Sequence, residues 1–323
     1  MKNISTSTYK IGPLLALFLF ITLSCDNASQ QRVIPTTNPF IAVLGIAQDA
    51  GYPQAGQREE WALIKERKAR PKNAVALALV DPVLKQRWLF EATPDFKFQL
   101  QMLDDISETN QYPLDGIFLT HAHMGHYTGL MNLGREAMGT SAVPVYAMPK
   151  MQEFLTQNGP WSQLVALNNI KLKALANEVE INLNPSIKVT PFLVPHRDEF
   201  SETVGYSIEI NGKSLVFIPD IDKWAKWDKD ILEVIKAADY AFLDASFYKN
   251  GEIPGRDMNE IPHPFVEESI SLFESLSEAD KAKVHFIHFN HTNALLFENS
   301  PEYKEVKEKG FNMAYEGQII QFR

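Results

Sequence analysis

The chain has 323 residues, of which 45% are hydrophobic and 22% charged, which is enough for one large folded domain or two small ones. Its formal net charge is -9 and no basic stripe is present, so nucleic acid is not expected as a partner. The chain contains a single cysteine, Cys25, so no internal disulfide is expected.

The N-terminal segment, residues 1–25, has the composition of a secretory signal. Two lysines precede an uncharged run over residues 11–23, and Cys25 follows this run. The run is short for a membrane span. Cys25 stands where a bacterial lipoprotein carries its lipid, although Thr22 occupies a position that usually holds an aliphatic residue; an ordinary export signal or a short anchor is the alternative. We therefore predict an exported lipoprotein, held at a bacterial membrane and facing the periplasm or cell surface.

Residues 26–39 are polar and read as a flexible tether, and the folded domain is predicted over residues 40–323. Apolar runs predict strands over residues 41–46, 73–80, 87–91, 115–120, 143–147, 171–181, 187–194, 203–210, 214–218, 240–243 and 283–287. Periodic patterns predict helices over residues 61–72, 96–109, 127–138, 149–157, 230–237, 265–276 and 302–309. Asn211-Gly212 predicts a hairpin, and residues 313–322 predict a final hairpin or strand pair. This order favours an α+β fold of two sheets packed face to face, with helices outside.

Several predicted strands end in an acidic or metal-capable residue. These residues are His121, His196, Asp220, Asp244 and His288. Strand ends at one edge of a sandwich can meet in space although they are far apart in sequence, so we expect these side chains to converge.

Three of the eight histidines fall within six residues, in the run Thr120-His121-Ala122-His123-Met124-Gly125-His126. The run follows a predicted strand, so its side chains project from a strand-to-helix turn. His121 and His123 can converge on one ion, whereas His126 points elsewhere and suits a second, neighbouring ion. Imidazole is the commonest side-chain ligand for metals such as zinc, so we predict a metal site; an incidental polar turn is the alternative.

The pattern T-H-x-H-x-x-H-x-x-G-L resembles the metal-binding signature of the metallo-β-lactamase superfamily, H-x-H-x-D-H. The resemblance covers nearly the whole domain and implies a four-layer αββα sandwich. It implies a first ion bound by three histidines, a bridging carboxylate, and two further histidines on a second ion. In that order, these residues are His121, His123 and His196, then Asp220, then His126 and His288. Zinc is the implied metal, with iron and manganese as alternatives.

Gly125 departs from this signature, because the family usually has an aspartate there that binds the second ion. Glycine supplies no carboxylate, so either the second site is weakened or another carboxylate replaces it. Asp49, in the loop after the first predicted strand, is the candidate, and its alternative role is to cap the Asp-Ala-Gly turn. One or two ions are therefore expected.

Four separated blocks resemble, in order, the pyrroloquinoline quinone biosynthesis protein B branch of the superfamily. The blocks are residues 50–54, 126–130, 244–248 and 288–293. That branch carries a cysteine cluster after the first block, where this chain has Gln57, Arg58 and Glu59, so no structural zinc is expected there. The branch is also not expected to be exported, so this chain is predicted to have its own function.

The branch resemblance implies that residues 247–263 border a substrate pocket. Arg256 and Tyr127 are predicted to contact a small-molecule substrate, with Arg256 suited to an anionic group. His263 is a predicted proton donor, and His291 is predicted to line the pocket while His288 binds metal. For Arg256 and His263 an ordinary solvated loop is the alternative. The predicted catalytic residues are Asp220, His263 and His291.

The resemblance favours a metal-dependent hydrolase, in which a metal-bound hydroxide attacks an ester, lactone, amide or phosphodiester. Metal binding lowers the pKa of water from ~15.7 to about 7, which makes hydroxide available at neutral pH. One alternative is an iron-dependent redox enzyme that uses oxygen, as the branch implies. Another is a surface-binding lipoprotein in which Gly125 marks a lost activity. The sequence leaves the substrate and the oligomeric state open.

Overall fold

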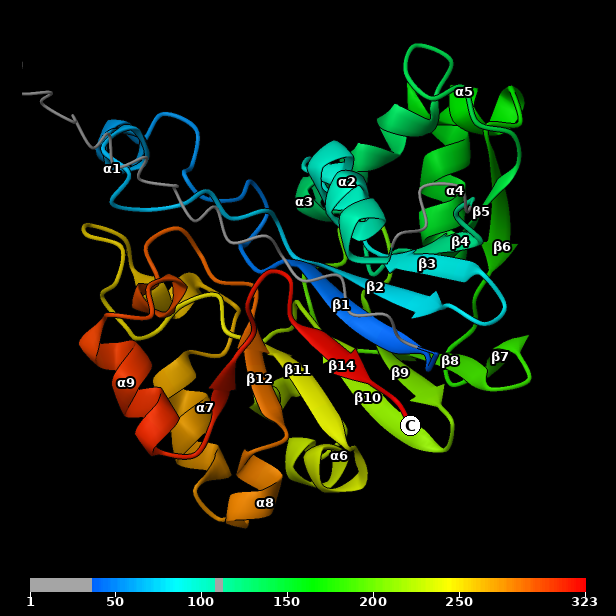
Figure 1. The fold of residues 1–323 in the computed structure, drawn as a ribbon. Helices are drawn as coiled ribbons and strands as arrows, with labels where there is room; N and C mark the ends of the chain where they lie inside the picture. Colours follow the sequence, from blue (N-terminus) through cyan, green and yellow to red (C-terminus); the bar gives the residue numbers. More distant parts are fainter. Residues whose placement is uncertain (1–36, 108–112) are drawn as a thin grey trace, which may run out of the picture. The chain divides into compact units, whose positions relative to one another are not determined.

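The computed structural model describes residues 37–107 and 113–323. The predicted export signal, Cys25 and residues 26–36 of the predicted tether lie outside the described residues. The described strands form two mixed seven-stranded sheets that lie face to face, and helices cover their outer faces (Figure 1). The prediction of an αββα sandwich is confirmed. Within the described part of the chain, no helix has both the length and the apolar character needed to span a membrane.

The first sheet is antiparallel over its first four strands and parallel from the fourth to the last. Its strands, in spatial order, are β14 (Ile319–Gln321), β1 (Phe40–Gly45), β2 (Ala76–Asp81), β3 (Gln86–Phe90), β4 (Gly116–Phe118), β5 (Val143–Ala147) and β6 (Ile170–Ala174). Every residue of β1 and β2 is buried, because the second sheet covers one face and α2 (Phe96–Ser107) contacts both strands on the other.

The second sheet has the opposite arrangement of strand directions, with four parallel strands followed by antiparallel ones. Its strands, in spatial order, are β13 (Asn312–Met313), β12 (Val284–Ile287), β11 (Tyr240–Asp244), β10 (Lys213–Ile218), β9 (Val204–Ile210), β8 (Ile187–Leu193) and β7 (Ile181–Asn184). The predicted hairpin is confirmed: Ile210 pairs with Lys213, and Asn211 and Gly212 have φ of +53° and +77°, the left-handed region that this turn requires.

The remaining helices are short, and most of them bury one face against a sheet. The α-helices are α1 (Arg58–Lys65), α3 (Met124–Tyr127), α4 (Pro149–Gln157), α5 (Trp161–Ala166), α6 (Ile231–Ala237), α7 (Val266–Phe273), α8 (Glu278–Lys281) and α9 (Pro301–Glu308). The 3-10 helices are η1 (Thr128–Leu133), η2 (Trp224–Lys226), η3 (Met258–Glu260) and η4 (Ala294–Leu296). Helices α2, α4 and α5 cover the first sheet, whereas α6, α7 and α9 cover the second (Figure 1).

Three predicted segments are corrected. Residues 171–181 are not one strand, because β6 ends in the first sheet and β7 begins in the second. Residues 313–322 are not a hairpin, because β13 pairs with β12 while β14 pairs with β1 across the sandwich. The helix predicted over residues 127–138 is η1, which follows α3 and stops before Gly134. Apolar patterning predicts a strand or helix locally, but it does not say which sheet a strand joins.

Parallel strands bring the chain's polar strand ends to one edge. β10, β11 and β12 run parallel, so the residues that follow them leave the second sheet at the same end. The end of β1 reaches that edge as well, since Gln48 N donates to Phe289 O at 2.8 Å and Phe289 N donates to Ile46 O at 2.8 Å. The loops after β1, β4, β8, β10, β11 and β12 therefore meet there.

Candidate metal centre

The histidine motif lies on the turn that leaves β4 and enters α3. His123 has extended backbone, with φ -87° and ψ 143°, immediately before the helix. Two hydrogen bonds attach this turn to the opposite sheet and the loop before it: Val204 N donates to Thr120 O at 3.2 Å, and Ala122 N donates to Ser201 Oγ at 2.8 Å. The imidazoles are therefore held at the rim between the two sheets.

The first metal group consists of His121, His123, His196 and Asp220, whose ligand atoms lie within 4.8 Å of one another. His121 Nε2 lies 2.8 Å from His123 Nδ1 and 3.3 Å from Asp220 Oδ2. His196 Nε2 lies 3.2 Å from the same Asp220 oxygen. Ligands at about 2.0–2.1 Å from a tetrahedral zinc ion stand roughly 3.4 Å apart, so these spacings suit one ion.

The second metal group consists of Asp49, His126 and His288 and lies beside the first. Asp49 Oδ1 is 3.4 Å from His126 Nε2. That nitrogen is 3.8 Å from Asp220 Oδ2, the oxygen that also faces the first group. Asp220 therefore links the two groups, and His126 lies with Asp49 and His288 in the second group.

Each imidazole of the first group has its outer ring nitrogen beside a polar side chain. The contacts are His121 Nδ1 to Thr120 Oγ1 at 2.9 Å, His196 Nδ1 to Asp222 Oδ1 at 3.3 Å, and His123 Nε2 to Glu199 Oε2 at 3.1 Å. Such contacts decide which nitrogen of a ring faces a metal and fix the orientation of the ring. The three inner nitrogens consequently face one another.

The two histidines of the second group are oriented in the same way. His126 Nδ1 lies 3.2 Å from Oε1 of the buried Glu91, and His288 Nδ1 lies 2.8 Å from Ser246 Oγ. Burial lowers the pKa of His126, but the charge of Glu91 and the contact with Asp49 outweigh it, so the pKa is raised well above the usual value. The motif alone does not point to Glu91 or Ser246, although Glu91 ends one predicted strand and Ser246 follows another by three residues.

Whether the residues of the two groups fit a cation can be judged from three of their inner nitrogens. Nε2 of His126, His196 and His288 is buried in each case and has no hydrogen-bond partner within the described residues. A buried polar atom without a partner costs about 1–3 kcal/mol, so three of them at one rim would be unfavourable in a purely structural cluster. Neutral imidazole nitrogens and a carboxylate are the donors that zinc accepts, so the residues fit a metal ion.

A further set of buried ligand-type residues, Asp220, Asp244, His263 and His288, has ligand atoms within 4.8 Å of one another. Two of its members, Asp244 and His263, form a network behind the second group. Asp244 Oδ1 accepts hydrogen bonds from Ser246 N and Oγ, and Oδ2 accepts from Ile221 N and lies 2.8 Å from His263 Nδ1. Both oxygens are thus occupied, which favours an orienting role for Asp244 over a ligand role. Burial lowers the pKa of His263, but Asp244 and then Asp220 raise it to about 9 overall.

Asp220 is the carboxylate on which the centre is built, and its charge is favoured. Burial by itself raises the pKa of Asp220, yet the neighbouring imidazoles, His196 and His263 first, hold it well below the usual range. The side chain is 3% exposed. A buried, ionised carboxylate surrounded by imidazoles is ready to bind a cation without first losing a proton.

Three predicted site residues are not brought to the centre. The prediction for Tyr127 is corrected: its buried ring packs in the first-sheet core, with its centroid 4.9 Å from that of Trp161. His291 belongs to neither metal group, and its Nδ1 lies 2.6 Å from Glu60 Oε1. Arg256 is exposed in the loop that follows β11.

A pocket of about 320 Å³ forms the mouth of the centre, and it is lined by ligand residues of both groups. Asp49 and His123 contribute to its wall, together with Gly125 and the exposed Arg197. A larger pocket of about 680 Å³ shares Ala50 with the mouth. The centre is therefore reachable from solvent, and there is space beside it for the non-reacting part of a substrate.

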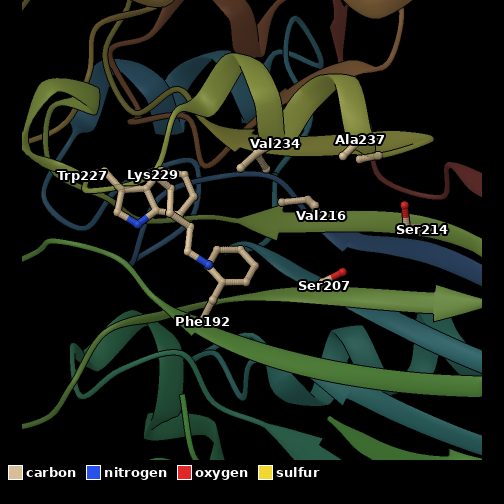
Figure 2. A pocket seen from close by; sticks show the side chains of 9 residues that line it. Phe192, Ser207, Ser214, Val216, Trp227, Lys229, Val234 and Ala237 are labelled. Atoms are coloured by element: carbon tan, nitrogen blue, oxygen red, sulfur yellow. The ribbon is translucent and has the colours of Figure 1, made fainter. Parts of the chain in front are cut away.

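The pocket in Figure 2 is a different site. It has a volume of about 300 Å³ and lies between α6 and strands β8, β9 and β10. Phe192 and Trp227 stack there with ring centroids 5.7 Å apart, and the ammonium of Lys229 lies 5.4 Å from the Phe192 ring centroid. Its wall includes none of the described residues that form the two metal groups, so it is not part of the metal centre.

Comparison with known proteins agrees with this geometry. The family described as Beta-lactamase superfamily domain matches residues 86–289. Coenzyme PQQ synthesis protein B of Methylorubrum extorquens strain PA1 is 25% identical over 303 residues, which cover 86% of this chain and 98% of that protein.

Two solved structures show the same fold. The crystal structure of Zn(2+)-bound PqqB from Methylobacterium extorquens has a TM-score of 0.73 at 23% identity, and the match covers 88% of this chain and 100% of that one. A diphosphatase from the PhnP family has a TM-score of 0.61 at 21% identity, covering 88% and 97%. From its fold, its histidine and aspartate groups and these matches, the chain belongs to the metallo-β-lactamase superfamily, in its PqqB-like branch.

Proposed function

We propose that this protein is a metal-dependent hydrolase that cleaves an ester, lactone, amide or phosphodiester bond in a small molecule. The observation that carries the proposal is the convergence of His121, His123 and His196 on the buried carboxylate of Asp220. A polar side chain contacts the outer nitrogen of each ring, so the inner nitrogens of the three rings face one another. With Asp220 they make four protein ligands, and a catalytic zinc ion can accept a water or substrate atom beyond these by becoming five-coordinate.

A bound divalent cation supplies one kind of chemistry: it polarises the scissile bond and lowers the pKa of a coordinated water from ~15.7 to about 7. The residues of the chain supply the rest. Arg197, at the mouth, can bind an anionic part of the substrate. Nδ1 of His263 lies 2.8 Å from Asp244 Oδ2 and 3.2 Å from Asp220 Oδ1, and we infer that this buried ring donates a proton to a leaving group.

The two neighbouring pockets support a small-molecule substrate over a polymer. The mouth holds about 320 Å³, and the larger pocket that shares Ala50 holds about 680 Å³. Exposed rings of Trp61 and Phe98 line the larger pocket, together with the carboxylates of Asp95 and Glu316. An organic group of moderate size, extending from the mouth past Ala50, is the substrate class that these walls favour.

The test uses the purified full-length chain. Metal content is measured by mass spectrometry, and turnover is measured with p-nitrophenyl acetate, nitrocefin, a chromogenic lactone and bis(p-nitrophenyl) phosphate. His123→Ala is expected to lose metal and turnover together. His285→Phe removes an imidazole outside the centre and is expected to retain both. A wild-type protein without zinc, iron or manganese, or an active metal-free His123→Ala protein, would contradict the proposal.

A second candidate function follows from the names of the relatives. They are described as coenzyme PQQ synthesis protein B. The branch resemblance of the sequence implies, for this candidate, that the same histidines bind iron and that the reaction consumes oxygen. Iron content together with oxygen uptake favours this candidate, whereas zinc content with turnover of a chromogenic ester or phosphodiester excludes it.

We also propose that the protein works outside the cytoplasm, attached to a membrane through a lipid on Cys25. The support is sequence alone: two lysines, the uncharged run over residues 11–23, and a single cysteine directly after Ser24. Cys25→Ser is expected to move the protein from the membrane fraction to the soluble fraction and to prevent incorporation of labelled palmitate. A wild-type protein that is soluble and unlabelled would contradict this proposal.

A further inference from the structure

Gly125 and the loop after β1 approach each other more closely than any side chain would permit. A Cβ atom built on Gly125 would lie 2.4 Å from Asp49 Cα, 2.6 Å from Asp49 Oδ1 and 3.0 Å from Asp49 Cβ. Real Cβ atoms essentially never approach a heavy atom that closely. The backbone of Asp49 therefore occupies the space in which a side chain at position 125 would begin.

Asp49 is held in that space by its neighbours and not by chance packing. Gln48 N donates to Phe289 O at 2.8 Å, and Gly51 N donates to Gln48 O at 3.0 Å. Asp49 itself has φ of +38°, a left-handed conformation that non-glycine residues rarely adopt. Strained backbone of this kind clusters at functional sites, and here it turns the carboxylate toward the second metal group.

The contacts of Asp49 argue against a purely orienting role. His126 already has Glu91 beside its Nδ1, so its ring needs no second carboxylate to fix it. Asp49 Oδ1 instead faces Nε2, the inner nitrogen, at 3.4 Å. Only Oδ1 of Asp49 makes this contact with His126. The Asp49 side chain is 48% exposed and lines the mouth of the centre.

The second metal group has a carboxylate of its own only if Asp49 is a ligand. Ser246 occupies Nδ1 of His288, so Nε2 of His288 and Nε2 of His126 are the nitrogens available to an ion. Asp220 Oδ2 lies 3.8 Å from His126 Nε2 and is shared with the first group. Without Asp49, an ion there would have a single, shared carboxylate to balance its charge.

We propose that Asp49 is a ligand of a second divalent cation, together with His126, His288 and Asp220, and that Gly125 is the residue that admits it. The metal-binding carboxylate has thus moved from the histidine motif to the loop after β1, and the glycine is the consequence of this move. This inference rests on the proposed metal centre but is independent of which bond the protein cleaves.

The test measures zinc stoichiometry and affinity of the full-length protein by chelator competition, and cobalt(II) absorption spectra provide a second readout. The wild type is expected to bind two ions. Asp49→Asn keeps the size of the side chain and is expected to weaken the second ion by more than about 10-fold while the first is retained, since even second-shell changes cost 10–100-fold.

Gly125→Ala is the sharper variant, because it adds only a methyl group and removes no ligand atom. Its Cβ must displace the Asp49 backbone, so we expect the same loss of the second ion as in Asp49→Asn. Gly159→Ala is the matched control, since a Cβ at Gly159 meets nothing within 4 Å. Thermal melts show whether each variant folds.

The outcomes separate this inference from the proposed function. Loss of the second ion in both variants, with the first retained, supports it. Two ions of unchanged affinity in either variant overturn it while the metal centre stands. A wild type that binds one ion, with no change in Asp49→Asn, overturns it as well. A wild type that binds none overturns the proposed function and this inference together.

Discussion

Glu91 and His126 form a fully buried pair at the end of β3, with Glu91 Oε1 3.2 Å from His126 Nδ1 and neither side chain exposed. Glu91 Oε1 also accepts a hydrogen bond from Thr120 Oγ1, and that hydroxyl oxygen lies 2.9 Å from His121 Nδ1. One carboxylate therefore orients a histidine of each metal group. The backbone of Glu91 has φ of +82°, so the chain tolerates backbone strain in order to place this carboxylate between the two groups.

Glu91→Gln is expected to weaken binding of both metals by about 10–100-fold, because removing an outer-shell carboxylate releases the ring orientation that it fixes. Chelator competition measures the change. Asp81→Asn is the matched control. Asp81 is also buried, but its carboxylate accepts hydrogen bonds from Val83 N and Leu84 N in the turn between β2 and β3, away from the metal groups. Wild-type affinity in Glu91→Gln would show that Glu91 only fills space.

Ser246→Ala removes the hydroxyl that joins Asp244 to His288 Nδ1. We expect zinc affinity at the second group to fall by about 10-fold or more, since the His288 ring loses the contact that selects its tautomer. Ser269→Ala is the control, because Ser269 is also fully buried but accepts its hydrogen bond from Trp224 Nε1. The control should lose about 1 kcal/mol of stability and no metal affinity.

His263→Asn tests the proposed proton donor. Loss of a general acid typically costs about 10²–10⁴-fold when the leaving group needs a proton. We therefore expect a large drop in kcat with alkyl or unsubstituted phenyl substrates, and only a few-fold drop with p-nitrophenyl substrates, whose leaving group departs as the anion. Metal content should stay unchanged. An equal loss for both substrate types would assign His263 a structural role.

Tyr127→Ala and Tyr127→Phe test the corrected position of this residue. Its ring packs against Phe154 and Trp161 in the core of the first sheet. We expect Tyr127→Ala to reduce the free energy of unfolding by about 3 kcal/mol through the cavity that it leaves, and Tyr127→Phe to change KM and kcat little. Urea unfolding and steady-state kinetics measure both. A raised KM in Tyr127→Phe would return Tyr127 to the substrate site.

His285 predicts how stability depends on pH. Burial first, and then the charge of Lys307, lower the pKa of His285 to about 4, while the ring stacks on Phe242 with centroids 4.9 Å apart. The unfolded value is about 6.5, so the unfolded chain binds this proton more readily. The contribution of the neutral His285 ring to the free energy of unfolding is therefore fully present above pH 6.5. It is lost as the pH falls toward 4, and the loss is about 3 kcal/mol at pH 4.

The comparison of wild type with His285→Phe isolates this effect, because phenylalanine keeps the stacking and does not titrate. Urea unfolding between pH 7.5 and pH 4.5 should show a steeper loss of stability in the wild type. The other titrating groups are common to both proteins and cancel in the difference. Parallel curves for the two proteins would mean that His285 is protonated equally easily in the folded and unfolded states.

The sequence by itself determined the features that depend on neighbours along the chain. The Asn211-Gly212 hairpin, the bounds of β5 and α4, and the placement of Asp220 and His288 just after strands all follow from local patterns. Turn residues and side-chain alternation act over a few residues, so they are readable without a structure. The spacing of the histidine motif also separated His126 from His121 and His123, and in the structure His126 lies in a different group of possible ligands.

Only the tertiary structure decided which distant residues meet. Residues 313–322 contain two strands, but sheet packing alone places them in different sheets. Glu91 becomes the partner of His126, and Asp49 fills the space beside Gly125, because backbone hydrogen bonds across the sandwich bring the ends of β1, β3 and β12 to one rim. Tyr127 turns into the core for the same reason: sheet register and helix packing are cooperative properties of the whole fold, which local sequence patterns do not encode.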